Sequence, residues 1–334
     1  MLRFPIRRKQ SEGFILVAVL WIISALAGVA AVYSVYVNET ASMMVGQNEQ
    51  LEALELAISG VELAAYKLTA IPDAQPSRGN LVYRIGSAEV MVEFRAETAR
   101  IDLNLSPKPV LAGLFVALGV QGDAAEGYAD RIVAWRTPLA SGANDTEGGL
   151  YRGKSYGPRH GPFEHVNELA LLAGFPPALV DCALPYVTVY SGQSAIDVFD
   201  ASAVVLSALP GITPDRVALL MSQRQGASQD VLRAQLGMAA QYVTVQPSRT
   251  NRVTVGIRFK SNRRVFSEAV ILLADKDDEP YRMLSWHHDI GELHGMRGLL
   301  EPASTCAARR VEGSLTLPIL AEQASRVSRL SSPS

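Results

Sequence analysis

An uninterrupted apolar run follows a short polar leader at the start of the chain. From Phe14 to Val37, the sequence FILVAVLWIISALAGVAAVYSVYV has no charged residue over 24 positions. About 20 apolar residues in a helix are enough to cross the core of a bilayer. The leader carries a cluster of cations, Arg3, Arg7, Arg8 and Lys9. Because a basic flank stays cytoplasmic, the pattern predicts a single transmembrane helix with the remaining chain exported.

The helical pattern continues beyond the apolar run. Residues 38–70 keep a helix-forming composition, and Pro72 ends it. Their apolar positions recur at spacings of three, four or seven, which places them on one face of a helix. These positions are Leu51, Leu54, Ile58, Val61 and Leu68. We expect half of this long helix to lie in a membrane or filament core and half to pack on a folded domain.

Two strand-like runs come next. Residues 81–85 form the first, and residues 89–96 (EVMVEFRA) alternate apolar and polar side chains. Gly86 and Ser87 between them fit a tight hairpin connection. The order predicts a long helix followed by an antiparallel sheet.

A helical block then separates these strands from later ones, which predicts an α+β fold with a large all-α inserted domain. The predicted parts are 1–13, a leader; 14–37, the membrane or filament-core helix; 38–102, its continuation and first strands; 103–240, the insert; 241–300, returning strands; and 301–334, a largely disordered tail. Helices are expected at 107–118, 123–136, 164–173, 176–184, 201–209, 214–224 and 228–240. Strands are expected at 242–246, 252–260, 265–274 and 281–286.

The insert contains an internal echo. Ile101-Asp102, followed by Val110-Leu111, recurs 95 residues later as Ile196-Asp197, followed by Val205-Leu206. Two copies are too few for a solenoid, and they predict paired helical units that pack on each other. A Leu-Pro-Gly-Ile run at 209–212 resembles the turn of a helix-hairpin-helix module.

Charge argues against nucleic acid as a partner of that turn. The leader holds four Lys/Arg and one Glu, which leaves residues 14–334 with 27 bases and 32 acids, a net charge of −5. A nucleic-acid binder normally carries a basic stripe. We therefore interpret Gly211 as a residue that permits a tight turn between helices.

Candidate chemistry is sparse. His160 with His165, and His287-His288, are the histidine groups, and neither has the helical spacing of a zinc site. No G-x-S-x-G, P-loop or catalytic cysteine context occurs, so we assign no catalytic residue. Cys182 and Cys306 both fall on the exported side, where an oxidising compartment permits a disulfide between them.

The leader resembles that of the type IV pilin-like class. A basic leader, a Gly13-Phe14 junction and an immediate apolar helix match its signal, which implies prepilin peptidase cleavage between them and N-methylation of Phe14. Such signals usually have Glu at the fifth mature position, where this chain has Ala18. A neutral residue there is typical of the K-type minor pseudopilin of type II secretion, which also carries a large helical insert.

Two alternatives to pilin-like processing remain. Ala25-Leu26-Ala27 could serve as the cleavage site of an ordinary secretory signal, or the helix could stay as an uncut anchor. The first is compatible with a secreted hydrolase, and the second with a membrane-anchored periplasmic binding or scaffold protein unrelated to secretion.

The resemblance also implies partners and a location. It implies a single-pass subunit of the bacterial inner membrane with a periplasmic C-terminal part. That subunit joins the I- and J-type minor pseudopilins and other subunits at the tip of a periplasmic pseudopilus, and supports the export of folded proteins.

One loop resembles a calcium-binding segment of the K-type family. Trp135-Arg136 precedes TPLASGANDTEGGLYRG, in which Asn144, Asp145 and Glu147 are the side-chain candidates for calcium. Thr137 and Leu139 depart from the family pattern, which tends to have Asp there. Further on, Asn167 and Glu168 lie in the first turn of a predicted helix, where acids are favoured, and we interpret both as structural.

Overall fold

The computed structural model describes residues 12–70, 76–142, 145–224, 229–246, 248–274 and 279–290. The chain divides into two compact units, Met1–Leu56 and Ala57–Ser334. One helix, α1 (Glu12–Thr69), runs from the first unit into the second. The predicted leader up to residue 11 and the predicted tail 301–334 lie outside the described residues.

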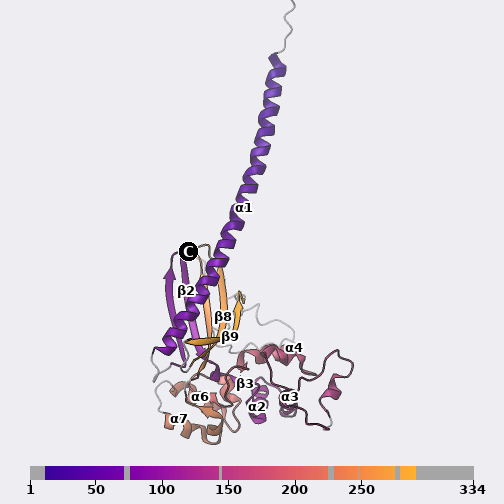
Figure 1. The fold of residues 1–334 in the computed structure, drawn as a ribbon, viewed down its shortest axis with the longest axis vertical. Coiled ribbons are helices and arrows are strands. Elements are labelled where there is room, and N and C mark those ends of the chain that lie inside the picture. The colour runs from indigo at the N-terminus through magenta and orange to yellow at the C-terminus, as the bar shows by residue number, and fades with distance from the viewer. Residues whose placement is uncertain are drawn as a thin grey trace, which may run out of the picture. The chain divides into compact units, whose positions relative to one another are not determined.

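An antiparallel sheet of five strands forms the framework of the second unit (Figure 1). Its order in space is β1-β2-β7-β8-β9, so strands far apart in the sequence lie side by side. The insert leaves the sheet after β2 and returns at β7, which confirms the predicted α+β fold with a helical insertion. The strands are β1 (Arg78–Ile85), β2 (Ala88–Ala96), β7 (Thr250–Arg258), β8 (Arg264–Leu273) and β9 (Tyr281–His288).

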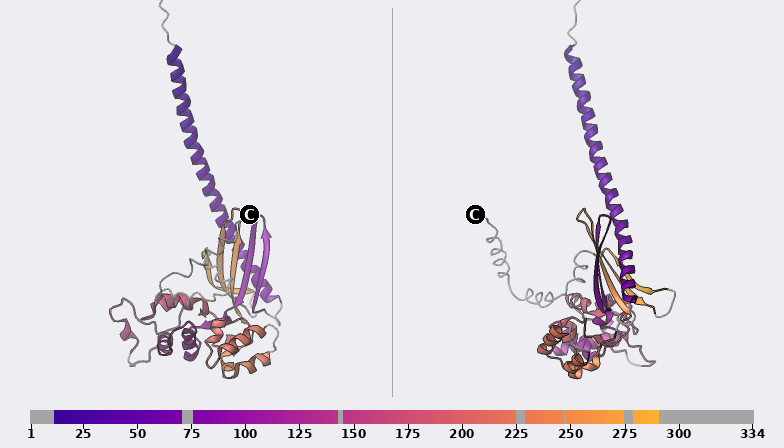
Figure 2. Two further views of the ribbon diagram at one scale, coloured as in Figure 1. Left: turned by 180° about the vertical axis from the view of Figure 1, so that it is seen from behind. Right: turned by 90° about the vertical axis from the view of Figure 1, so that its left-hand side faces the viewer.

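Within the second unit, the last part of α1, residues 57–69, covers one face of this sheet (Figure 2). Gly60 marks the contact, because a Cβ added there would lie 2.9 Å from both γ-carbons of Val255 and 3.0 Å from a γ-carbon of Val92. The sheet side chains at this face, such as Val90 and Phe94, are fully buried. The pattern of small helix residues against large strand residues therefore brings helix and sheet into close contact.

The insert consists of short helices and four two-residue strands. Its elements between β2 and β7 are η2 (Glu97–Ala99), β3 (Ile101–Asp102), α2 (Lys108–Ala117), α3 (Gly122–Arg136), η3 (Gly148–Tyr151), η4 (Val166–Leu171), α4 (Pro177–Ala183), η5 (Leu184–Tyr186), β4 (Val187–Thr188), β5 (Ile196–Asp197), α5 (Ala203–Ser207), α6 (Pro214–Gln223), α7 (Gln229–Leu236), η6 (Gly237–Tyr242) and β6 (Val243–Thr244).

Three expectations from the sequence were wrong in detail. The predicted helix at 164–173 is the short 3₁₀ helix η4, which ends before Gly174 at φ +74°. The predicted helix at 228–240 breaks into α7 and η6 at Gly237, whose φ is +56°. Glycine tolerates this left-handed conformation, which ends a regular helix.

The third correction concerns the boundary at residue 241. The predicted strand at 242–246 is β6, and it pairs with β5 inside the insert instead of joining the five-stranded sheet. The sheet therefore resumes at Thr250. Strand pairing depends on which chain segment lies alongside, so local β-propensity could not assign the partner.

The internal echo is a repeated structural unit. Ile101-Asp102 pairs in parallel with Val187-Thr188, and Ile196-Asp197 pairs in parallel with Val243-Thr244. Each closing strand lies in the same tetrapeptide, Tyr-Val-Thr-Val, at 186–189 and 242–245. The two repeat units therefore run from 101 to 189 and from 196 to 245. This confirms the prediction of paired helical units.

Equivalent helices of the two repeat units pack on each other. Counting from the Ile-Asp pair, α2 corresponds to α5 and Gly113 to Ala208. A Cβ added to Gly113 would lie 2.0 Å from the carbonyl oxygen of Ala208, so these equivalent positions meet at the helix crossing. Arg136 donates to the carbonyl of Ser106 at 2.8 Å, as Arg224 does to that of Ala201 at 2.5 Å. The two repeat units therefore pack on each other through equivalent helices, and each holds its own first segment with an equivalent arginine.

Candidate functional site

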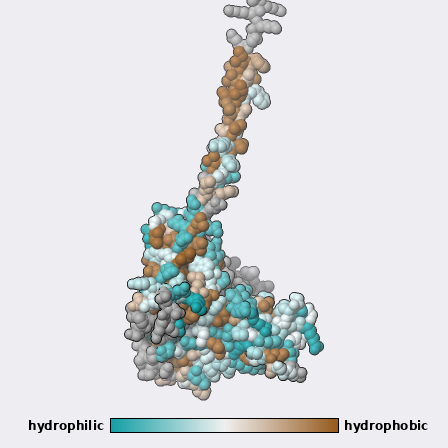
Figure 3. All heavy atoms as spheres, viewed as in Figure 1, coloured by the Kyte–Doolittle hydropathy of each residue, from teal (hydrophilic) through white to brown (hydrophobic). Residues whose placement is uncertain are grey.

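The N-terminal helix carries the features of a membrane anchor. Among the described residues, one segment is long and apolar enough to span a membrane, Phe14–Thr40. None of it is buried within the protein, and Figure 3 shows its largely hydrophobic surface. Within it, Ser24 donates its hydroxyl to the carbonyl of Leu20 at 2.8 Å, which satisfies a polar group inside lipid. This segment fits a single-pass anchor.

The predicted processing site lies at the start of this helix. Phe14 is in the first turn of α1 and is 80% exposed, and Ala18 lies four residues further on. The backbone of Gly13 belongs to the same helix. Cleavage between Gly13 and Phe14 stays a prediction.

Two of the three predicted calcium ligands, Asp145 and Glu147, lie among the described residues. Asp145 accepts a hydrogen bond from the backbone N–H of Gly148 at 2.6 Å and contacts the Nε2 of His160 at 3.2 Å. These contacts hold the pKa of Asp145 below its usual value, with the Gly148 hydrogen bond contributing most. Asn144 lies outside the described residues.

Glu147 differs from Asp145 in having an unsatisfied oxygen. Its Oε1 is buried and has no hydrogen-bond partner among the described residues, and burial raises the pKa of this carboxyl. A cation would satisfy such an oxygen, but calcium needs six to eight oxygen ligands. The described residues contain no group of three or more acidic, histidine or cysteine side chains arranged around one point. The carboxylates described here therefore do not suffice for a calcium site.

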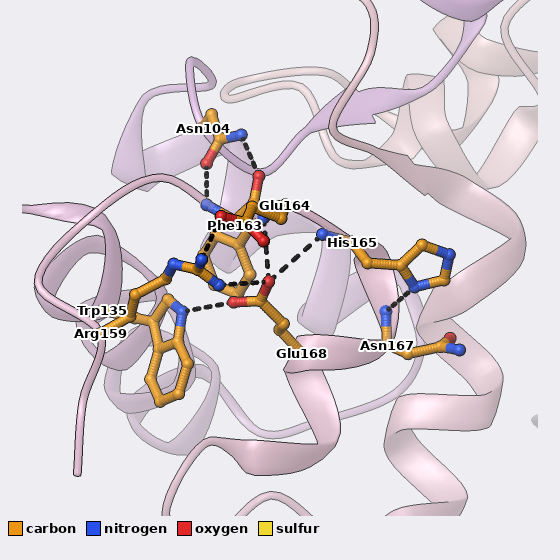
Figure 4. A network of polar contacts seen from close by, with 8 residues as sticks. All are labelled: Asn104, Trp135, Arg159, Phe163, Glu164, His165, Asn167 and Glu168. Atoms are coloured by element: carbon orange, nitrogen blue, oxygen red, sulfur yellow. Dashed lines mark hydrogen bonds and ion pairs between the residues drawn. The ribbon is translucent and has the colours of Figure 1, made fainter. Parts of the chain in front are cut away.

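A polar network centred on Glu168 organises the loop beside it (Figure 4). Its carboxylate accepts hydrogen bonds from Trp135 Nε1 at 3.1 Å and Arg159 Nη1 at 2.9 Å, as well as from the backbone N–H groups of Glu164 and His165. Burial acts to raise the pKa of Glu168, but the hydrogen bonds from the Glu164 backbone N–H, Trp135 and Arg159, with the charge of Arg159, hold it below its usual value. Glu168 thus joins the end of α3 to the start of η4.

Asn104 extends this network toward the start of the first repeat unit. Its side-chain amide donates to the carbonyl of Phe163 at 2.9 Å, and its Oδ1 accepts from the backbone N–H of Phe163 at 2.7 Å. Trp135 stacks on the ring of Phe163, with centroids 6.0 Å apart. Asn167 contributes its backbone N–H, which donates to Nδ1 of His165 at 3.1 Å. The network positions backbone and gives no arrangement of acid, base and nucleophile.

A second, buried network joins the sheet to the insert. Glu97 in η2 is fully buried, and its Oε1 accepts from Nε of Arg252 on β7 at 2.7 Å. Arg252 also forms an ion pair with Glu268 on β8, and Thr188 on β4 donates its hydroxyl to Glu97. Burial would raise the pKa of Glu97, but the charges of Arg252 and Arg100, together with the hydrogen bonds from Arg252 and Thr188, lower it below its usual value, so the carboxyl stays ionised. Nothing in the sequence around these residues indicated that they meet.

The remaining candidates lie apart from one another or outside the described residues. Cys182 lies in α4, whereas Cys306 is not among the described residues, so their pairing stays a prediction. His165 and His287 do approach, with ring centroids 5.9 Å apart. One signal in the sequence was not used in the predictions. The tetrapeptide Tyr-Val-Thr-Val occurs at both 186–189 and 242–245, and it marks the end of each repeat unit.

A long N-terminal helix that begins with an apolar span, an antiparallel sheet, and a mainly helical domain inserted between two neighbouring strands define a pilin-like fold with an insert. Comparison with known families makes this more specific. Residues 95–192 match the family described as type II secretion system (T2SS), protein K. The matched range contains the first repeat unit with its Glu168 network, and over this part of the chain it confirms the predicted resemblance to the K-type minor pseudopilin.

The fold is also found in a solved structure. A chain of the crystal structure of the GspK-GspI-GspJ complex from the enterotoxigenic Escherichia coli Type 2 Secretion System is similar to this chain with a TM-score of 0.57. Sequence identity is 17%, over 74% of this chain and 99% of the other. This likeness establishes a shared fold. No curated protein sequence matches the chain.

Proposed function

We propose that this K-type minor pseudopilin caps the periplasmic tip of a type II secretion pseudopilus and supports its assembly for the export of folded proteins. The observation that carries the proposal is the order of parts. An apolar helix without an acid at Ala18 precedes a sheet whose neighbours β2 and β7 are separated by the insert, and residues 95–192 match protein K.

Ala18 supports a position at the end of the filament. In pilin-like filaments, the fifth-position glutamate is thought to meet the N-terminal amine of the next subunit toward the tip. An unpaired carboxylate in an apolar helix bundle would be costly. A subunit with nothing above it gains nothing from that acid, and the bulky insert would hinder the stacking of another subunit. Ala18 therefore suits a cap.

The partners and orientation follow from the same proposal. The solved relative was crystallised as a GspK-GspI-GspJ complex, so we infer that I- and J-type minor pseudopilins are the partners here too. The basic leader supports an orientation with the N-terminus in the cytoplasm and the second unit in the periplasm, across the inner membrane. Prepilin peptidase would act on Gly13-Phe14. We assign no catalytic role to this chain.

Calcium binding remains a proposal for the loop that holds Asp145 and Glu147. The unsatisfied Glu147 Oε1 supports it, and backbone carbonyls or Asn144 would have to supply further ligands. We expect calcium titration of the purified protein to show binding that Glu147→Gln weakens and the exposed control Asp181→Asn leaves unchanged. Unaltered calorimetric titrations in Glu147→Gln would remove this loop as the site.

A mass spectrum of the mature N-terminus from the native membrane tests the processing on which the function depends. N-methylated Phe14 supports the proposal. An intact Met1 would instead indicate an uncut anchor, and a start near Gly28 an ordinary secreted protein. A second test locates the subunit: immunogold labelling is expected at filament ends, and labelling along the shaft would contradict a cap.

A further inference from the structure

Two histidine rings meet where the helical insert lies against the sheet. His165 is the capping residue at the start of η4 in the insert, and His287 lies on β9, the last strand of the sheet. Their ring centroids are 5.9 Å apart. Both residues belong to the second unit. The contact therefore joins two segments that are far apart in the sequence, one from each part of this unit.

A hydrogen bond determines the protonation state of the His165 ring in this contact. Its Nδ1 accepts the backbone N–H of Asn167 at 3.1 Å and so caps the start of η4. A ring nitrogen that accepts a hydrogen bond has no proton of its own, so the ring is neutral and carries its proton on Nε2. A proton on Nδ1 would turn two N–H groups toward each other. Protonation of His165 is therefore incompatible with the cap that starts η4.

The charged groups around the His165 ring oppose its protonation. His287 on β9 and Arg252 on β7 act against a positive ring, and Glu168 in η4 acts in its favour. Figure 4 shows the ring beside Asn167, pointing away from the Glu168 carboxylate, which is turned toward its own hydrogen-bond donors. Burial, with the charges of His287 and Arg252, lowers the pKa of His165 below its usual value.

The surroundings of His287 offer little compensation for a second positive ring. His287 lies opposite Glu268 on β8, but that carboxylate already forms an ion pair with Arg252. The Nδ1 of His287 contacts the hydroxyl of Ser285, a neutral group, at 3.3 Å. Two protonated rings at this junction would therefore repel each other.

We propose that the contact between His165 and His287 is an acid-sensitive latch that holds η4 of the insert against β9 of the sheet. In neutral solution the rings are uncharged, they lie together, and η4 is capped. Acid protonates both rings, removes the cap and sets like charges against each other, so that η4 leaves β9. The buried pair of Glu97 and Arg252 contains no histidine and keeps the rest of the junction closed. The latch is a property of the folded second unit and does not depend on the proposed function.

The direction of the pH effect follows from the lowered pKa of His165. The closed latch binds this proton less tightly than the open segment, so closure is fully favoured above the usual histidine pKa of about 6.5 and weakens as pH falls below it. Like charges at this separation should weaken closure roughly tenfold at the effective dielectric constant near a protein surface. The opening is local, which distinguishes it from the effect of the Asp197 proton on global stability.

Hydrogen exchange of the full chain in detergent micelles tests the latch at pH 7.5 and pH 5.5, after correction for the intrinsic exchange rates. We expect the opening of residues 166–171 and 285–288 to increase roughly tenfold at pH 5.5, while β2 and β7 stay protected. His165→Asn keeps a side-chain acceptor at the cap and gains no proton, so it should remove the pH response. His287→Gln removes one of the two like charges and should reduce the response.

The matched control is His288→Gln, which removes the neighbouring histidine, whose Nδ1 contacts the Ser267 hydroxyl at 2.9 Å. It should leave the pH response intact. Equal opening of the unaltered chain at both pH values, or a full response in His165→Asn, would overturn the latch.

A titration of the histidine rings by NMR in the unaltered chain tests the latch without any variant that could fail to fold. The His165 ring should titrate below its usual pKa. A His165 ring that titrates at or above about 6.5 would overturn the proposal.

Discussion

The Glu97 carboxylate and the Arg252 guanidinium form a buried ion pair at 2.7 Å between residues 155 positions apart. The pair connects η2, where the chain leaves the sheet, to β7, where it returns. Thr188 adds a hydrogen bond from the end of the first repeat unit. This polar contact therefore links the two places where the chain passes between the sheet and the insert.

Removal of the cation from this pair should be costly. Arg252→Met leaves Glu97 without its ion-pair partner in the interior, where the charge of Arg100 and the Thr188 hydrogen bond compensate only in part. We expect a loss of roughly 3–5 kcal/mol in the free energy of unfolding. Urea denaturation of the purified protein measures it. The matched control is Arg258→Met, which breaks the exposed pair with Glu89 and should cost about 0–1 kcal/mol. Equal losses in the two variants would show that the buried pair has no special role.

The crossing of the two repeat units predicts the effect of one methyl group. Gly113→Ala places a Cβ against the carbonyl oxygen of Ala208, so the helices must separate, at a cost of about 1–3 kcal/mol. Gly127→Ala, in α3, meets no atom within 4 Å and should stabilise by roughly 0.5–1 kcal/mol through helix propensity. Thermal unfolding should show a lower melting temperature for Gly113→Ala and a higher one for Gly127→Ala. Stabilisation by Gly113→Ala would contradict the packing of α2 on α5.

Asp197 predicts a dependence of stability on pH. Burial raises its pKa to about 6, with a smaller contribution from Asp200. Because the folded protein binds this proton more tightly than the unfolded chain, stability falls as pH rises from about 4 to about 6 and stays lower above. Asp197→Asn keeps an acceptor for the Phe199 N–H and should gain about 1–3 kcal/mol at neutral pH. Denaturant unfolding at pH 4.5 and 7.5 tests it, and an equal effect of Asp197→Asn at both pH values would rule out this proton.

The Glu168 network predicts local loosening when its acceptor is removed. Glu168→Ala leaves Trp135 Nε1, Arg159 and two backbone N–H groups without their acceptor, and we expect a loss of about 2–4 kcal/mol. Hydrogen exchange of residues 159–168 should rise at the same time. Glu164→Ala removes a mostly exposed partner of Arg159 and should cost less than about 1 kcal/mol. Unchanged exchange in Glu168→Ala would show that the loop is held by other contacts.

The sequence by itself determined the elements with long, one-sided patterns. The apolar run from Phe14, the alternating strand at 89–96 and the echo at 101 and 196 each depend on residues near in sequence, so local periodicity was sufficient. Together with the Gly13-Phe14 junction and Ala18, they led to the pilin-like class and the K-type family.

Only the tertiary structure decided which distant segments meet. The strand at 243–244 pairs with β5 instead of the sheet, and the helix expected at 164–173 is the 3₁₀ helix η4, whose Glu168 binds the backbone that precedes it. Glu97 and Arg252 are ordinary charged residues until the insert brings η2 beside β7. Desolvation, ion pairing and strand pairing depend on which residues are neighbours in space. The pattern of residues along the sequence does not specify these neighbours.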